Sequence, residues 1–134
     1  EFILHKLKFL KNDTKKRQKI AEIYKEKLKN YVIVPNRNLI SKTVHTYHRY
    51  VIRLKNNYER NQLKMYLQKL NIETKIHYTK PIHGYKCFAK YSFKKRLKNS
   101  ENQSNTILSL PINHFMTFKE VNYVIHSIIR FFNK

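Results

Sequence analysis

The sequence contains little glycine, cysteine or acid, and it has no long apolar run. One glycine, Gly84, among 134 residues excludes the glycine-rich phosphate loops of P-loop and dinucleotide-binding proteins. One cysteine, Cys87, excludes an internal disulfide and a zinc site built from cysteines. The longest apolar candidate, residues 121–132, is interrupted by polar side chains and falls short of the ~20 residues that span a bilayer. Residues 1–5 lack the zones of a signal peptide. We therefore expect a cytoplasmic chain with no membrane partner.

The charge is strongly basic. There are 29 Lys and Arg residues against 8 Asp and Glu, which gives a net charge of +21. Such a charge suits nucleic acid, anionic lipid or a phosphorylated substrate. However, the lysines are spread along the whole chain, and the abundance of Lys, Asn, Ile and Tyr is typical of an AT-rich genome. We therefore favour the interpretation that most lysines solvate helix faces. With 41% hydrophobic residues, the chain can still build a core.

Two helical patterns open the chain. Leucines at positions 4, 7 and 10 recur every three residues, and apolar residues at 20, 24, 28 and 31 recur every three or four. Both spacings place side chains on one helix face. Residues 11–16 between them carry no apolar side chain. Either one long helix has an exposed middle, or two helices meet near Asn12 with Asp13 or Thr14 as the N-cap.

The middle of the chain predicts a strand, a helix and a second strand. Residues 47–54 alternate in character, as strands do. Asn56 and Asn57 offer an N-cap for a helix over 58–70, and Asn71 follows it where a left-handed C-cap residue is expected. Residues 72–78 predict the second strand. We expect the two strands to pair in one sheet.

The last third predicts two longer helices and a short buried strand. After a loop with a short helix at 87–91, residues 100–107 suit a helix and 108–111 a buried strand stopped by proline. Thr117 and Glu120 have the spacing of a capping box at the start of a helix over 117–132, packed on one face of the sheet. Residues 1–134 should thus form a single domain of the α/β or α+β class, with a few-stranded sheet packed by helices.

Five segments, in order, resemble the C-terminal part of the DegT/DnrJ/StrS aminotransferases, which are fold type I enzymes that use pyridoxal phosphate. The segments are residues 3–24 (the family's long helix), the strand 47–53, the helix with Arg60, Leu63 and Leu67, the stretch 72–83, and the pair of pieces 100–101 and 108–112. The resemblance covers nearly the whole chain. The departures are Asn71 where the family has Gly, Thr79 where Pro is common, and Tyr85 where Gln often follows the last His. Both Asn and Gly tolerate the left-handed region, so the turn survives.

The resemblance implies a function for the complete enzyme. It would transfer an amino group from glutamate to a nucleotide-linked keto-sugar, with pyridoxal 5'-phosphate as cofactor, and it would act as a dimer. The family's cofactor lysine, and the aspartate that faces the pyridine nitrogen, lie in an N-terminal domain to which nothing here corresponds. We therefore expect the partner of this chain to be that missing domain or a second copy, and we expect no transamination by this chain alone.

Three residues are candidates for substrate binding. His48 lies in the first predicted strand, Tyr78 at the end of the second, and His83 in the following loop. By resemblance, Tyr78 and His83 would line the sugar pocket and bond to hydroxyl or phosphate oxygens. The alternative for each is an ordinary polar residue of a strand or surface. We predict no catalytic residue in this chain.

Other reactive groups do not form convincing sites. His77 and His83 are irregularly spaced, with no acid near His83 in sequence, so no metal site is predicted. Cys87 beside Phe88 is predicted to be a small buried hydrophobic residue. Glu101 is interpreted as an early helix residue favoured by the helix dipole.

Two functions from other classes stay open. A basic nucleic-acid-binding module could use the ten tyrosines and eight phenylalanines for stacking. Against it, most aromatic residues fall on apolar faces, and no RNA-binding or helix-turn-helix signature occurs. The chain could also be a non-catalytic remnant that only packs against a partner domain.

Overall fold

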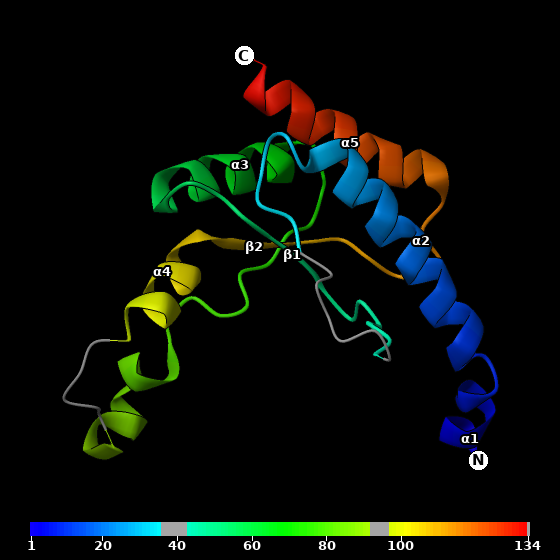
Figure 1. Ribbon diagram of the computed structural model, residues 1–134, viewed down its shortest axis with the longest axis horizontal. Helices are drawn as coiled ribbons and strands as arrows, with labels where there is room; N and C mark the ends of the chain where they lie inside the picture. Colours follow the sequence, from blue (N-terminus) through cyan, green and yellow to red (C-terminus); the bar gives the residue numbers. More distant parts are fainter. Residues whose placement is uncertain (36–42, 92–96, 134) are drawn as a thin grey trace.

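The computed structural model describes residues 1–35, 43–91 and 97–133. Helices dominate the described residues (Figure 1). In chain order the elements are α1 (Phe2–Leu7), α2 (Leu10–Leu28), β1 (Tyr50–Arg53), α3 (Asn57–Lys69), the 3-10 helices η1 (Ile82–Gly84) and η2 (Lys86–Tyr91), α4 (Lys98–Thr106), β2 (Ile107–Leu110) and α5 (Phe118–Phe132). This mixture of helices with a small sheet confirms the predicted fold class.

The sheet differs from the predicted one in its pairing. β1 pairs antiparallel with β2, with Tyr50 opposite Leu110 and Arg53 opposite Ile107. The segment 72–78 forms no strand, and its backbone meets the sheet only at Lys75, which bridges Ser109 on the other edge of β2. The prediction that 47–54 pairs with 72–78 is therefore wrong, because β2 lies between them. The predicted short buried strand supplies the missing partner.

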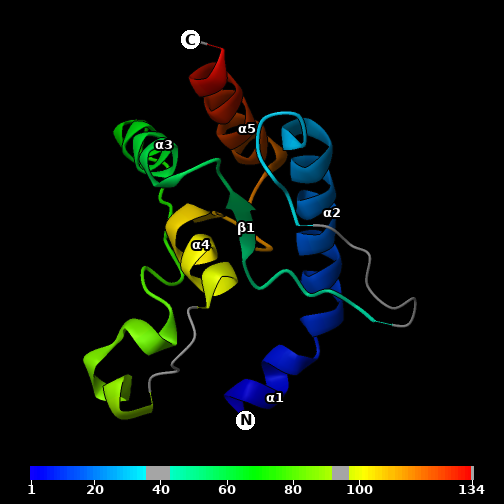
Figure 2. The ribbon, with the colours of Figure 1, turned by 60° about the vertical axis from the view of Figure 1, so that its left-hand side comes forward.

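Three helices cover one face of the sheet. In Figure 1, α2, α3 and α5 lie on the same side of the two strands, and α4 and α2 lie at opposite sides of the strand pair in both Figure 1 and Figure 2. The fully buried side chains between helices and sheet come from α2, both strands, α3 and α5; they are Tyr24, Leu28, Tyr50, Ile52, Leu63, Leu67, Leu108, Val121 and Ile128. Because side chains alternate along a strand, Ser109 points to the opposite face. Ser109 is nevertheless buried, so that face is covered at this point.

The helix termini follow the predicted signals at three positions. The Asn56 side chain accepts a bond from the Glu59 amide at the start of α3. Thr117 and Glu120 form the predicted capping box of α5, with Thr117 N donating to Glu120 Oε2 at 2.7 Å. Asn71 has φ 56, which confirms its left-handed conformation after α3. These local interactions are encoded within a few residues, so the sequence predicts them well.

The N-terminal helices break earlier than predicted. α1 ends at Leu7 and α2 begins at Leu10, so the polar residues 11–16 lie inside α2 and neither Asp13 nor Thr14 caps it. Asp13 instead lies 3.5 Å from His114 Nε2, in the segment that links β2 to α5. Thr14 is buried and its Oγ1 accepts a bond from Arg17 at 3.2 Å. Tertiary partners therefore stabilise the polar stretch as helix.

Candidate functional site

The stretch after α3 runs beside β2 on the side away from α2. The turn at Asn71 is closed by Ile72 N, which donates to Leu67 O at 2.9 Å. Lys75 then exchanges two backbone hydrogen bonds with Ser109, of 3.2 and 2.8 Å. These bonds fix the position from which the following residues, 77–84, leave the sheet.

His77 lies against the face of the sheet that carries the Ser109 side chain. Its Nδ1 lies 3.0 Å from the Ser109 hydroxyl. Loss of hydration lowers the pKa of His77, and the positive charges of Arg49, Lys75 and His48 lower it further. The imidazole is therefore neutral at pH 7 and bonds to Ser109 as an uncharged ring.

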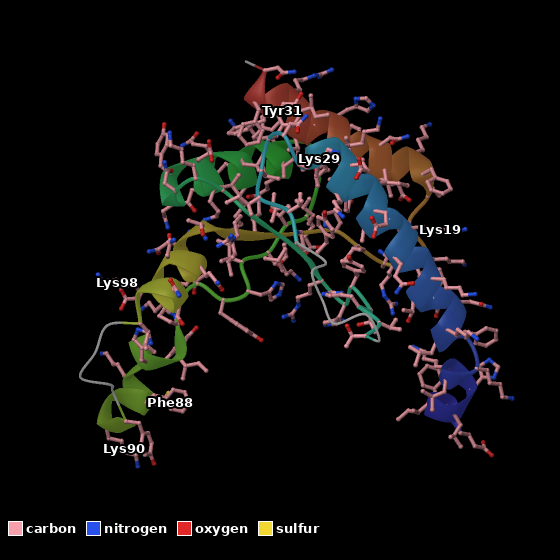
Figure 3. All side chains as sticks on the ribbon, viewed as in Figure 1. Lys19, Lys29, Tyr31, Phe88, Lys90 and Lys98 are labelled. Carbon is pink, nitrogen blue, oxygen red and sulfur yellow. The ribbon has the colours of Figure 1, made fainter. Side chains whose placement is uncertain are left out.

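A cavity of about 450 Å³ opens beside His77. Its walls come from the stretch 77–83, from η2 and from α4; they include His77, Tyr78, Lys80, His83, Phe88, Tyr91, Gln103, Ser104 and Ile107. In Figure 3, Phe88 and Lys90 mark this part of the molecule, below α4 and Lys98. Aromatic rings with a few hydroxyl, amide and basic groups make a suitable lining for a small polar ligand.

His83, which lines the cavity, lies close to the carboxylate of Glu101. Its Nε2 lies 3.5 Å from Glu101 Oε1 in the first turn of α4, and the two side chains are only 22% and 26% exposed. Arg60 of α3 secures the other end of α4, because its Nη1 lies 3.4 Å from both Ser104 O and Ile107 O. The cavity wall is thus fixed at both ends of α4.

The structure brings together two of the three predicted residues. Tyr78, 64% exposed, and His83 both line the cavity. His48 is exposed in the bend before β1 and is not among the lining residues, although it lies near enough to His77 to lower that residue's pKa. The prediction of a buried Cys87 is wrong, because the residue is exposed in the 3-10 helix η2.

Sequence reasoning missed Glu101. Because no partner stands near it in sequence, the pattern predicts only an early helix residue, and Glu101 does lie in the first turn of α4. The fold, however, brings it within 3.5 Å of His83, which is 18 positions earlier in the chain. The Ser100-Glu101 pair in the family resemblance was the one available signal.

Neither a metal site nor a membrane-spanning helix is found among the described residues. Residues 1–35, 43–91 and 97–133 hold no group of three or more His, Cys, Asp or Glu side chains that could bind a metal ion. In the same ranges, no helix is long and apolar enough to cross a membrane.

The cavity does not fit pyridoxal phosphate by itself. The cofactor needs a lysine for its aldehyde, a carboxylate facing its ring nitrogen and a cradle of donors for its phosphate. Among the described residues that line the cavity there is one lysine, Lys80, which is exposed, and there is no carboxylate. The lining instead offers neutral and basic donors, which suit hydroxyl and phosphate oxygens.

The two-stranded sheet, its helical layer and this cavity together make up part of an aminotransferase domain. The chain belongs to the DegT/DnrJ/EryC1/StrS aminotransferase family, which matches residues 2–129. This confirms the resemblance noted in the sequence.

Known relatives are about three times as long as this chain. It is 32% identical over 127 residues to dTDP-3-amino-3,6-dideoxy-alpha-D-galactopyranose transaminase of Aneurinibacillus thermoaerophilus, covering 94% of this chain and 33% of the relative. A DegT/DnrJ/EryC1/StrS aminotransferase from Brucella abortus is 32% identical with a TM-score of 0.88, over 98% of this chain and 34% of that one. The putative sugar aminotransferase Spr1654 of Streptococcus pneumoniae, in its PLP form, shares the fold at 20% identity and a TM-score of 0.77, over 93% and 32%.

Proposed function

We propose that this chain is the substrate-side domain of a pyridoxal-phosphate-dependent sugar aminotransferase. The complete enzyme transfers an amino group from glutamate to a nucleotide-linked keto-sugar in the cytoplasm. One observation carries the proposal: in a chain of this family, Tyr78 and His83 lie in the same cavity. A nucleotide-sugar transaminase among the relatives supports the substrate class.

The cavity residues would orient the sugar nucleotide. The Tyr78 hydroxyl and the His83 imidazole would bond to hydroxyl or phosphate oxygens, and Glu101 would hold the His83 ring in place from 3.5 Å. His48 would act from outside the lining. Arg49 and Lys75 add positive charge around His77, and this favours a phosphorylated ligand.

The cofactor would be held outside this chain. Pyridoxal phosphate supplies the site that carries the amino group between the two substrates. Since the cavity lacks the groups that would bind it, we infer that a cofactor domain, or a second copy of the protein in a homodimer, provides them. The chain spans only about a third of its relatives' length, which leaves room for such a domain.

A chimera tests the assignment of the cavity. The matching third of the Aneurinibacillus transaminase would be replaced by this chain, and turnover of a dTDP-linked keto-sugar measured. We expect His83→Ala to lower kcat/KM by about tenfold or more, because a substrate oxygen loses the hydrogen bond from the imidazole. Cys87→Ser is the matched control, since its thiol is exposed and outside the lining.

The outcome depends on the contrast between these two variants. Equal activity of His83→Ala and the parent chimera would contradict the proposed role of the cavity. If the chimera does not fold, binding of a dTDP-sugar replaces turnover as the readout. NMR would then measure this binding to the chain outside the chimera and to its His83→Ala and Cys87→Ser variants.

The chain alone should not transaminate. A single-turnover assay would contain the chain, glutamate, pyridoxal phosphate and a panel of nucleotide-linked keto-sugars. We expect amino-sugar formation no faster than with free cofactor and a lysine-rich control protein. A null result that is rescued by adding the relative's cofactor domain supports the proposal, whereas clear activity without that domain would contradict it.

A further inference from the structure

A second cavity lies on the other side of the molecule and takes no part in the proposed function. It has a volume of about 760 Å³ and lies between the end of α2, the segment 30–35, the end of β1 and the start of α3. Figure 3 shows Lys29 and Tyr31 of this region next to the C-terminal end of α5, whereas Phe88, which lines the first cavity, lies far from it. We refer to the second cavity as the basic groove.

Four cations line the basic groove from two segments that are far apart in the chain. Lys25 lies in the last turn of α2 and Lys29 directly follows that helix, whereas Arg53 ends β1 and Lys55 lies between β1 and α3. Convergence of cations from different elements differs from a solvated helix face, where charges follow one element. The groove therefore concentrates positive charge at one place.

Glu59 is the one acid among the described lining residues, and its carboxylate accepts a hydrogen bond from the backbone. Glu59 Oε2 accepts a bond from Lys55 N at 2.8 Å, just as the Asn56 side chain accepts one from Glu59 N at 2.9 Å. Glu59 thus serves the start of α3. Lys29 has an ion pair with Glu26, 2.9 Å away, but both side chains are at least half exposed, so the pair is weak and open to exchange.

The backbone beneath the cations is rigid. Ile33 and Arg53 exchange two hydrogen bonds of 3.0 and 2.9 Å, which hold the segment 30–35 to the sheet. Tyr31 N and Val32 N both donate to Leu28 O, at 2.9 and 3.1 Å. These bonds fix the backbone from which Arg53 and the segment 30–35 line the groove.

An aromatic wall completes the groove. Tyr31 and Phe132 both line it, their ring centroids are 6.0 Å apart, and both side chains are half-buried. A planar ring can lie against Tyr31 while phosphates meet the lysines and Arg53. The volume is within the range of small-molecule sites, about 300–1,000 Å³.

The geometry points to a binding site for a free nucleoside polyphosphate in the basic groove, independent of the sugar-nucleotide cavity. Phosphate oxygens would be bound by Lys25, Lys55 and Arg53, and the base would stack on Tyr31. Both parts of such a ligand match a feature of the groove: charge on its rim and a ring on its wall.

Calorimetric titration of the whole chain with ATP tests this inference, with adenosine and inorganic tripolyphosphate as partial probes. We expect ATP to bind more tightly than tripolyphosphate and adenosine not to bind measurably. The double variant Lys25→Gln with Lys55→Gln should weaken ATP binding by about tenfold, which corresponds to ~1.4 kcal/mol. Tyr31→Leu should weaken ATP binding but not tripolyphosphate binding.

The control is a second double variant with the same net charge as Lys25→Gln with Lys55→Gln. Lys69→Gln with Lys119→Gln removes two exposed lysines away from the groove and should change ATP affinity by less than about twofold. Equal weakening by both pairs would mean that ATP responds only to the net charge of +21, and this would overturn the site. Absence of ATP binding, or equal affinity for ATP and tripolyphosphate, would also overturn the site. Tight binding of single-stranded DNA that ATP does not displace would overturn it as well.

Thermal unfolding of each variant establishes that it is folded. Tyr78→Phe changes only the first cavity and should leave ATP binding intact.

Discussion

Two buried tyrosines with different hydroxyl environments give a sharp test of the core. Tyr24 and Tyr50 are 0% and 1% exposed, and their ring centroids are 5.1 Å apart. Tyr24 Oη donates to Pro111 O at 2.9 Å. Tyr50 Oη is buried without a hydrogen-bond partner among the described residues. Burial is the largest effect that raises the pKa of both phenols, so both keep their protons at ordinary pH.

Removing each hydroxyl should therefore change stability in opposite directions. Tyr24→Phe leaves the Pro111 carbonyl without its donor and should lower the free energy of unfolding by about 1–2 kcal/mol. Tyr50→Phe removes a polar group that is buried without compensation and should raise the free energy of unfolding by about 0.5–1.5 kcal/mol. The shape of the ring is kept in both variants, so packing changes little.

Urea unfolding measures both effects in one assay. The midpoints should shift in opposite directions with the slope unchanged, because the surface exposed on unfolding is the same. Tyr58→Phe, at a residue that is 73% exposed, is the control and should change stability by less than about 0.5 kcal/mol. If Tyr50→Phe destabilises as much as Tyr24→Phe, the Tyr50 hydroxyl is bonded to an internal water and the reasoning fails.

Three further predictions concern the site and the caps. Arg60→Ala should lower the free energy of unfolding by about 2–4 kcal/mol, because it removes a buried guanidinium that bonds α3 to the end of α4. Urea unfolding measures this loss, and a value under ~1 kcal/mol would contradict the prediction. An NMR titration of His77 should give a pKa below the usual value, so the contribution of His77 to stability is lost as the pH falls below ~6.5. Arg49→Gln should raise the pKa of His77, because it removes a positive charge that repels the protonated ring. An unchanged pKa in this variant would contradict the repulsion by Arg49. Thr117→Ala should cost about 1 kcal/mol through loss of the N-cap, with retained thermal stability as the contrary result.

The sequence predicts most local structure because local structure depends on neighbours in the chain. The capping box at Thr117, the cap at Asn56 and the left-handed Asn71 each involve residues within five positions of one another. Helical periodicity is equally local, so α3 and α5 fall close to their predicted ranges. The family resemblance extended these predictions to the fold class and the substrate-side role.

Strand pairing was not predictable in the same way. The segment 72–78 has the composition of a strand, but pairing requires a free neighbouring edge, and β1 gives that edge to β2. β2 follows β1 by more than fifty residues, so no local pattern distinguishes it from 72–78 as a partner. The single bridge between Lys75 and Ser109 is what remains of the predicted strand.

The sequence by itself determined the helices, their caps, the basic charge and the family, because each is a property of composition or of short-range spacing. Only the tertiary structure decided which polar groups meet. It brought Glu101 to His83, placed Tyr78 and His83 in one cavity while leaving His48 outside its lining, and gathered Lys25, Arg53 and Lys55 around a groove. Glu101 and His83 are 18 positions apart and Lys25 and Arg53 are 28 apart, so packing of the helices on the sheet, and no local spacing, brings them together.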